Sequence, residues 1–137
     1  MQKLDAKPTG MNEPSNSSNR TWTGKFADAF RGVRLAVQES SFKVHMLMAA
    51  AVIICGIIFR VERIEWCILL VCIGMVMAAE VFNSAIESLS KAVDRNHNPD
   101  IGRALDQASG AVLICSLAAA AAGATIFIYR LVVLLGR

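Results

Sequence analysis

Three long apolar stretches constrain this 137-residue chain more than any other feature of its sequence. A helix that crosses a bilayer needs about 20 predominantly apolar residues. The second and third stretches are near that length, and the first reaches it when Phe42, Lys43 and His45 lie at the membrane boundary. The stretches occupy residues 44–59, 66–86 and 111–129. The sequence therefore predicts an all-α integral membrane protein with spans over about 43–60, 66–87 and 108–129.

Composition supports this prediction. Hydrophobic residues make up 55% of the chain and charged residues 18%, against about 45–50% and about 25% in ordinary soluble domains. A soluble bundle would need polar helix faces, which these stretches lack. The four cysteines lie inside apolar runs without the spacing of a zinc site or a disulfide framework. The net charge of +3 gives no indication of nucleic-acid binding.

The region before the first span divides into a tail and a helix. Residues 1–20 are polar and contain no apolar run, so we expect a disordered tail without a secretory signal. Over about 22–38, bulky apolar residues recur with helical spacing and basic residues occupy other faces. This pattern predicts an amphipathic helix in the membrane interface, and a soluble helix packed on its own domain is the alternative. Residues 21–137 would form one membrane domain.

Basic residues predict the orientation, because positively charged flanks tend to stay in the cytoplasm. The segment before the first span and the second loop carry more Lys and Arg than the first loop, which has only Arg60 and Arg63. The N-terminus is therefore expected inside, with Trp66 and Tyr129 at the outer boundary. The small residues at 118–123 permit close helix contact and indicate an oligomer.

Polar residues in the second span are the strongest candidates for chemistry. A carboxylate near the hydrocarbon core is costly unless it has a partner, so Glu80 is a functional candidate by default. At about 100° per residue, Asn83 and Glu87 lie roughly 60° and roughly 20° from Glu80 on the helix. Glu39 and Asp106 come just before the first and third spans. Four carboxylates and an amide are therefore expected at the cytoplasmic membrane face.

This placement favours phosphoryl transfer between cytosolic ATP and a membrane lipid. Mg²⁺ takes oxygen ligands and is held by one or two carboxylates plus substrate phosphates, a role that Glu39 and Glu87 can fill. Glu80 is the candidate base for an attacking hydroxyl. No glycine-rich phosphate loop is present in the sequence, so phosphate contacts would come from scattered basic groups such as Lys91, Arg95 and Arg103.

Two other classes remain open. In an ion-conducting subunit, Glu80, Asn83 and Glu87 would line a water path. That path should carry polar groups at more than one depth. We expect Ser116 to be the only polar residue in the outer half of the spans. In a structural protein, the same groups would only hold helices together by hydrogen bonds.

The residues at 80–87, Glu-Val-Phe-Asn-Ser-Ala-Ile-Glu, resemble the E-x-x-N-[ST]-A-I-E signature of the prokaryotic diacylglycerol kinase family, which also contains the undecaprenol kinases. The segment at 102–106 is similar to the G-R-A-K-D segment that opens the family's third span. The segment at 39–45 looks like the E-x-x-[FM]-[KR]-[IV]-H segment of Gram-positive-type members. The resemblance covers about residues 26–128.

The resemblance implies a homotrimer in the bacterial inner membrane, with sites between neighbouring subunits. It implies that Glu80 is the catalytic base at the lipid, that Glu39 and Glu87 bind Mg²⁺ and ATP phosphate, and that Asn83 is a donor to phosphate. It further implies that Asp106 contacts the nucleotide and that Ser109 lies near the lipid headgroup. The expected reaction is ATP-dependent phosphorylation of diacylglycerol to phosphatidic acid, with undecaprenol as the alternative substrate.

Two positions depart from the family pattern. Lys91 stands where the family often has Asp, and Leu105 stands where it has Lys. The second change removes a cation expected on the ATP phosphates. Lys91 or Arg103 is the candidate replacement for that charge, and Asp94 is the candidate replacement for the displaced carboxylate.

Overall fold

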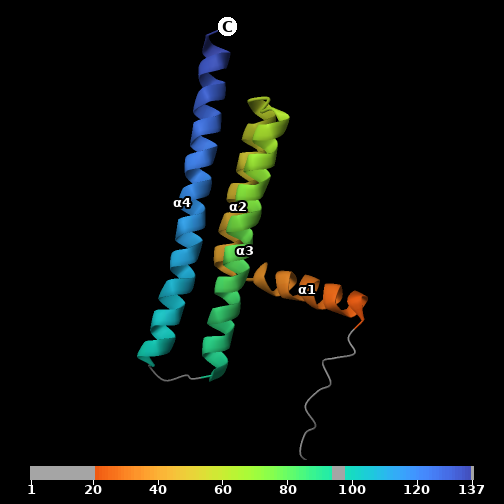
Figure 1. Cartoon of the computed structure of the whole chain (residues 1–137), viewed down its shortest axis with the longest axis vertical. Helices are drawn as coiled ribbons and strands as arrows, with labels where there is room; N and C mark the ends of the chain where they lie inside the picture. Colours follow the sequence, from red (N-terminus) through yellow and green to blue (C-terminus); the bar gives the residue numbers. More distant parts are fainter. Residues whose placement is uncertain (1–20, 94–97, 137) are drawn as a thin grey trace, which may run out of the picture.

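A computed structural model describes residues 21–93 and 98–136, which form four helices (Figure 1). The helices are α1 (Trp22–Ala36), α2 (Ser40–Ile58), α3 (Arg63–Val93) and α4 (Pro99–Leu135). α2, α3 and α4 are each long and apolar enough to cross a membrane. The all-helical fold and the three spanning helices are therefore confirmed. The tail at 1–20 and the candidates Asp94, Arg95 and His97 lie outside the described residues.

Local sequence sets where the helices begin. The Thr21 hydroxyl accepts a hydrogen bond from the Gly24 amide at 3.4 Å, which caps α1. At α4, the Asn98 side chain accepts from the Asp100 amide at 2.9 Å, and Pro99 stands in the first turn, where its missing N–H costs nothing.

α3 and α4 are longer than the spans that hydropathy predicts. With 31 and 37 residues, they rise about 46 Å and about 55 Å, whereas the hydrocarbon core is about 30 Å thick. Neither helix contains a proline beyond its first turn, so nothing stops the helix where the apolar stretch ends. Both helices therefore continue past the predicted spans.

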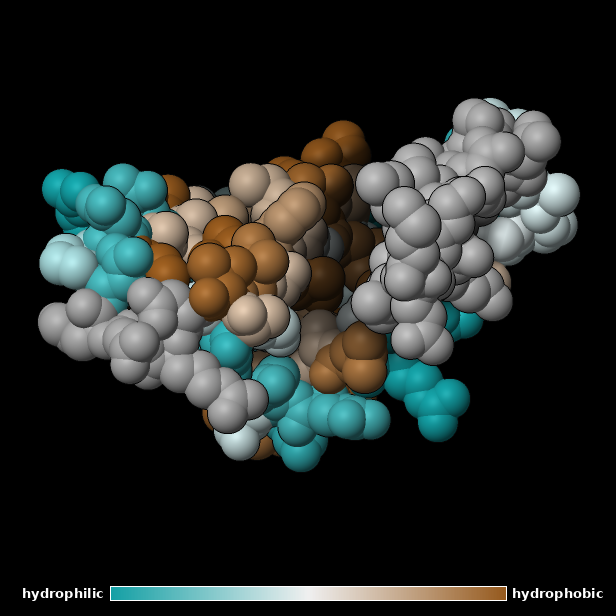
Figure 2. Space-filling view, turned by 90° about the horizontal axis from the view of Figure 1, so that it is seen from below, coloured by the Kyte–Doolittle hydropathy of each residue, from teal (hydrophilic) through white to brown (hydrophobic). Residues whose placement is uncertain are grey.

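α3 is the central helix. It has its most extensive contact with α4, packs against α2 as well, and touches α1, which extends sideways from the other three helices (Figure 1). Seen from below, apolar residues occupy the middle of this face and reach its upper edge, while hydrophilic residues gather at its left and lower margins (Figure 2).

The end of the bundle that includes the α2–α3 turn holds the main apolar cluster. Val61, Leu69 and Ile126 are its buried members. At the same end, Arg130 of α4 pairs with Glu65 of α3 at 2.6 Å and with Glu62 at 2.9 Å. These contacts fix how α3 and α4 are aligned along their lengths.

Candidate active site

Glu80, Asn83 and Glu87 lie on one face of α3. Glu80 is 2% exposed and Asn83 is 7% exposed, while Glu87 is partly buried. The Asn83 side-chain amide donates a hydrogen bond to Glu87 Oε1 at 3.0 Å. The structure thus brings together the three polar residues that helical periodicity groups in the second span. We call these three residues the polar stripe.

Two oxygens of the polar stripe have no hydrogen-bond partner within the described part of the chain. They are Glu80 Oε1 and Asn83 Oδ1, and both are buried. A buried acceptor without a donor costs about 1–3 kcal/mol, and more when it is charged. Both atoms therefore require a donor or a cation that the described residues do not supply.

The other predicted site residues lie nearer the surface. Glu39 caps the start of α2 without a side-chain hydrogen bond to the helix and is exposed. Asp106 and Ser109 are exposed on α4, and the exposed Arg103 pairs with Asp100 rather than with an acid of the polar stripe. Lys91 is also exposed.

These groups do not gather into a preformed cation cage. Within residues 21–93 and 98–136, no group of three or more His, Cys, Asp or Glu side chains could hold a metal ion. Glu39, the C-terminal half of α3 and the first turns of α4 nevertheless lie toward the same end of the bundle, opposite the α2–α3 turn (Figure 1). One chain therefore supplies the polar stripe, and the remaining candidates lie toward the same end of the bundle.

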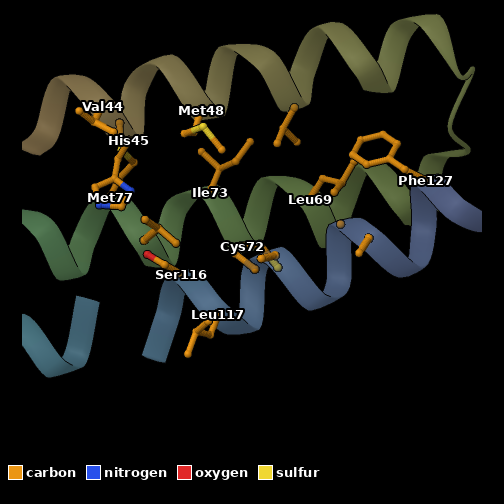
Figure 3. A pocket seen from close by; sticks show the side chains of 17 residues that line it. Val44, His45, Met48, Leu69, Cys72, Ile73, Met77, Ser116, Leu117 and Phe127 are labelled. Atoms are coloured by element: carbon orange, nitrogen blue, oxygen red, sulfur yellow. The ribbon is translucent and has the colours of Figure 1, made fainter. Parts of the chain in front are cut away.

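A cavity of about 530 Å³ lies between α2, α3 and α4 (Figure 3). His45, Met77 and Ser116 lie at one end, and Phe127 lies at the other (Figure 3). The walls are otherwise almost wholly apolar. The Ser116 oxygen is buried and has no hydrogen-bond partner among the described residues.

Ser116 lies closer to the level of Glu80 than we expected. α3 and α4 are antiparallel, with Glu65 beside Arg130 and Leu69 in one cluster with Ile126. The step from Leu69 to Glu80 equals the step from Ile126 back to Cys115, the neighbour of Ser116. The expectation that Ser116 lies in the outer half of its span is therefore wrong, because helix alignment places it at nearly the depth of Glu80, and position 116 also falls in the first half of the predicted span 108–129.

Sequence reasoning also missed the ion pairs of Arg130. Arg130 and Glu65 are 65 residues apart, and no motif or periodicity in the sequence pairs them. The available signal was opposite charge at the start of the second span and the end of the third. This pairing carries no site chemistry, but it determines which residues of α4 face the polar stripe.

Comparison with known proteins agrees with the motif resemblance. The profile of the family described as prokaryotic diacylglycerol kinase matches residues 27–127. An undecaprenol kinase of Bacillus subtilis (strain 168) is 34% identical over 117 residues, which cover 85% of this chain and 94% of that protein. The match includes the whole polar stripe and most of the three spans. The chain therefore belongs to the prokaryotic diacylglycerol kinase family.

Proposed function

We propose that this protein transfers the γ-phosphate of ATP to the hydroxyl of a membrane lipid alcohol at the cytoplasmic membrane face. The observation that carries the proposal is Glu80, a carboxylate buried in a membrane-spanning helix with one oxygen left without a partner. Such a group needs a function to offset the cost of its burial. An acceptor oxygen at that depth suits a lipid hydroxyl, which brings the missing donor.

Glu80 acts as the general base. Its carboxylate takes the proton from the lipid hydroxyl as the hydroxyl oxygen bonds to the γ-phosphorus and the bond from that phosphorus to the β–γ bridging oxygen breaks. ADP leaves, and the lipid carries the phosphate. The products are a phosphate monoester of the lipid and ADP. The proton stays on Glu80 until water accepts it.

Asn83 is the proposed donor to phosphate and also orients Glu87. One of its two amide N–H groups is used in the 3.0 Å hydrogen bond to Glu87 Oε1, and the second N–H is left for an ATP phosphate oxygen. Asp106 is the proposed nucleotide contact, and Ser109 the proposed contact to the lipid headgroup.

Glu39 and Glu87 are the proposed ligands of Mg²⁺. Carboxylate oxygens are the donors that this ion prefers, and one or two of them suffice when substrate phosphates complete its coordination. The unpartnered oxygens of the polar stripe fit an oxygen-rich site of this kind. When bound, Mg²⁺ supplies charge neutralisation at the ATP phosphates. Arg103 or Lys91 adds positive charge there in place of the family's Lys, which is Leu105 in this chain.

We further propose that the enzyme is a homotrimer in the bacterial inner membrane, with a cytoplasmic N-terminus and α1 on the membrane surface. Two observations support an assembly with shared sites. Glu39 and Asp106 are exposed in a single chain, and the exposed Ala118 and Ala121 provide a small-residue surface suited to close helix contact.

The test is phosphorylation of lipid by the purified protein in mixed micelles with Mg-ATP. Glu80→Gln should lower kcat by about 10²- to 10⁴-fold, because it removes a general base. Glu62→Gln is the matched control. Glu62 is exposed and lies directly before α3, at the end of the bundle away from Glu80. Equal loss in both variants, or full activity of Glu80→Gln, would contradict the proposal.

Diacylglycerol and undecaprenol should be offered separately in this assay. Diacylglycerol is our first candidate, and undecaprenol is favoured by the name of the Bacillus subtilis relative. Phosphatidic acid or undecaprenyl phosphate as the product identifies the substrate. A folded protein that forms neither across a wide range of ATP concentration would be a non-catalytic member.

A further inference from the structure

The apolar cavity continues the face of α3 that carries the polar stripe. Leu69, Ile73 and Val76 line the cavity, and at about 100° per residue each lies within roughly 40° of Glu80 on the helix. A molecule that reaches Glu80 from the membrane side therefore meets this cavity along the same helix face. The polar stripe and the cavity thus follow one another on the same face of α3, with Glu80 just beyond the residues that line the cavity.

The Ser116 hydroxyl stands at the junction of the two parts. A helical hydroxyl ordinarily bonds to the carbonyl four residues earlier, as Thr125 does with the Ala121 carbonyl oxygen at 2.9 Å. Ser116 makes no such bond, although its oxygen is buried. Its hydroxyl is available as a donor at the cavity end marked by His45 and Met77, at nearly the depth of Glu80 (Figure 3).

The lining excludes most classes of ligand. No Asp, Glu, Lys or Arg lines the cavity, so it offers nothing to a phosphate or a nucleotide. An apolar chain fits its walls. The polar groups at one end of the cavity favour a ligand whose oxygen-bearing end lies at that same end. The ligand is thus an amphiphile whose polar end lies toward Ser116 and His45, at nearly the depth of Glu80.

We propose that this cavity binds the hydrocarbon chain of the lipid substrate within one chain of the enzyme, with the Ser116 hydroxyl donating a hydrogen bond to an oxygen of the lipid. This inference rests on the proposed kinase function and specifies where its lipid lies. Diacylglycerol and a polyprenol share the required chemistry, a hydroxyl next to an apolar chain. Only diacylglycerol also has an ester carbonyl close to the hydroxyl.

Filling the cavity tests its role directly. Ala119 lines it, whereas the exposed Ala50 of α2 does not, so Ala119→Phe should raise the KM for lipid about tenfold while Ala50→Phe leaves it near the wild-type value. The KM for ATP should stay unchanged in both variants. Equal lipid KM values in Ala119→Phe and the wild type would overturn the proposal.

Photolabelling keeps the test independent of turnover and of the folding of Ala119→Phe. A diacylglycerol with a diazirine midway along one acyl chain should label cavity residues of the wild type and of Glu80→Gln, and excess unmodified diacylglycerol should remove the label. Label confined to residues outside the cavity would overturn the proposal. If the wild type phosphorylates no lipid, the kinase function fails, and the labelling pattern still decides the cavity.

Ser116→Ala tests the hydrogen bond. Loss of one such bond should lower kcat/KM about fivefold to tenfold. A loss with diacylglycerol alone assigns the bond to the ester carbonyl, and a loss with both lipids assigns it to the reacting hydroxyl oxygen. Unchanged kcat/KM with both lipids would overturn the role of Ser116.

Discussion

Gly56 of α2 occupies a position where the neighbouring helix leaves no room for a side chain. A Cβ atom built there would come within 2.7 Å of Trp66 Cη2. Gly56→Ala should therefore destabilise the protein by about 1–3 kcal/mol, as overpacking does, and thermal unfolding in micelles measures the change. Gly74→Ala is the control, because nothing lies within 4 Å of the added atom. Equal stability of the two variants would show that Trp66 can move aside.

Individual residues of the site were predictable to different degrees. Helical periodicity alone groups Glu80, Asn83 and Glu87, because all three belong to one helix whose geometry is fixed. The place of Ser116 in a cavity shared with α2 and α3 was not predictable, since it depends on how α4 is aligned with α3. That alignment rests on contacts such as Glu65 with Arg130, between residues far apart in the sequence.

At the scale of helices, the Arg130 ion pairs hold α3 and α4 together at the end of the bundle that includes the α2–α3 turn. The side chains of Arg130 and Glu65 are only 14% and 17% exposed. Arg130→Met should lower the free energy of unfolding, because it removes both ion pairs and leaves the partly buried Glu65 carboxylate without its guanidinium partner. Adding Glu65→Leu should restore much of this loss.

Unfolding by denaturant in micelles measures these changes. Glu62→Gln is the control and should cost under about 1 kcal/mol, since exposed pairs contribute little. Lipid kinase activity of the folded variants should stay close to the wild-type value, because the pair lies at the end away from Glu80. A double variant as unstable as Arg130→Met would contradict the explanation.

Hydropathy was sufficient to predict the three spanning helices but not their ends. The apolar stretches are long enough to allow no other membrane structure, so the number of spans follows from length. The helix ends follow instead from caps and from the absence of breaking residues, as at Asn98 and Pro99. Contacts between the helices required the structure.

At the scale of the whole molecule, the exposed Glu39 and Asp106 predict sites shared between subunits. Glu80→Gln and Asp106→Ala homo-oligomers should both lose activity. When the two variants are dissociated, mixed in equal amounts and reassembled, about a quarter of the sites should combine an intact Glu80 with an intact Asp106 from different chains. Lipid phosphorylation by the mixture measures the recovery, and no recovery would place both residues of a site on one chain.

The small buried fraction of the spans has a consequence for the protein outside its membrane. In the most apolar windows of α2, α3 and α4, only 11%, 17% and 11% of the residues are buried within the chain. A soluble protein encloses its own interior, whereas here lipid tails or sister subunits must supply most of the atoms against which the side chains pack. During purification the detergent therefore supplies packing contacts that a soluble protein finds in its own interior. The stability measured in one detergent is a property of the protein and that detergent together.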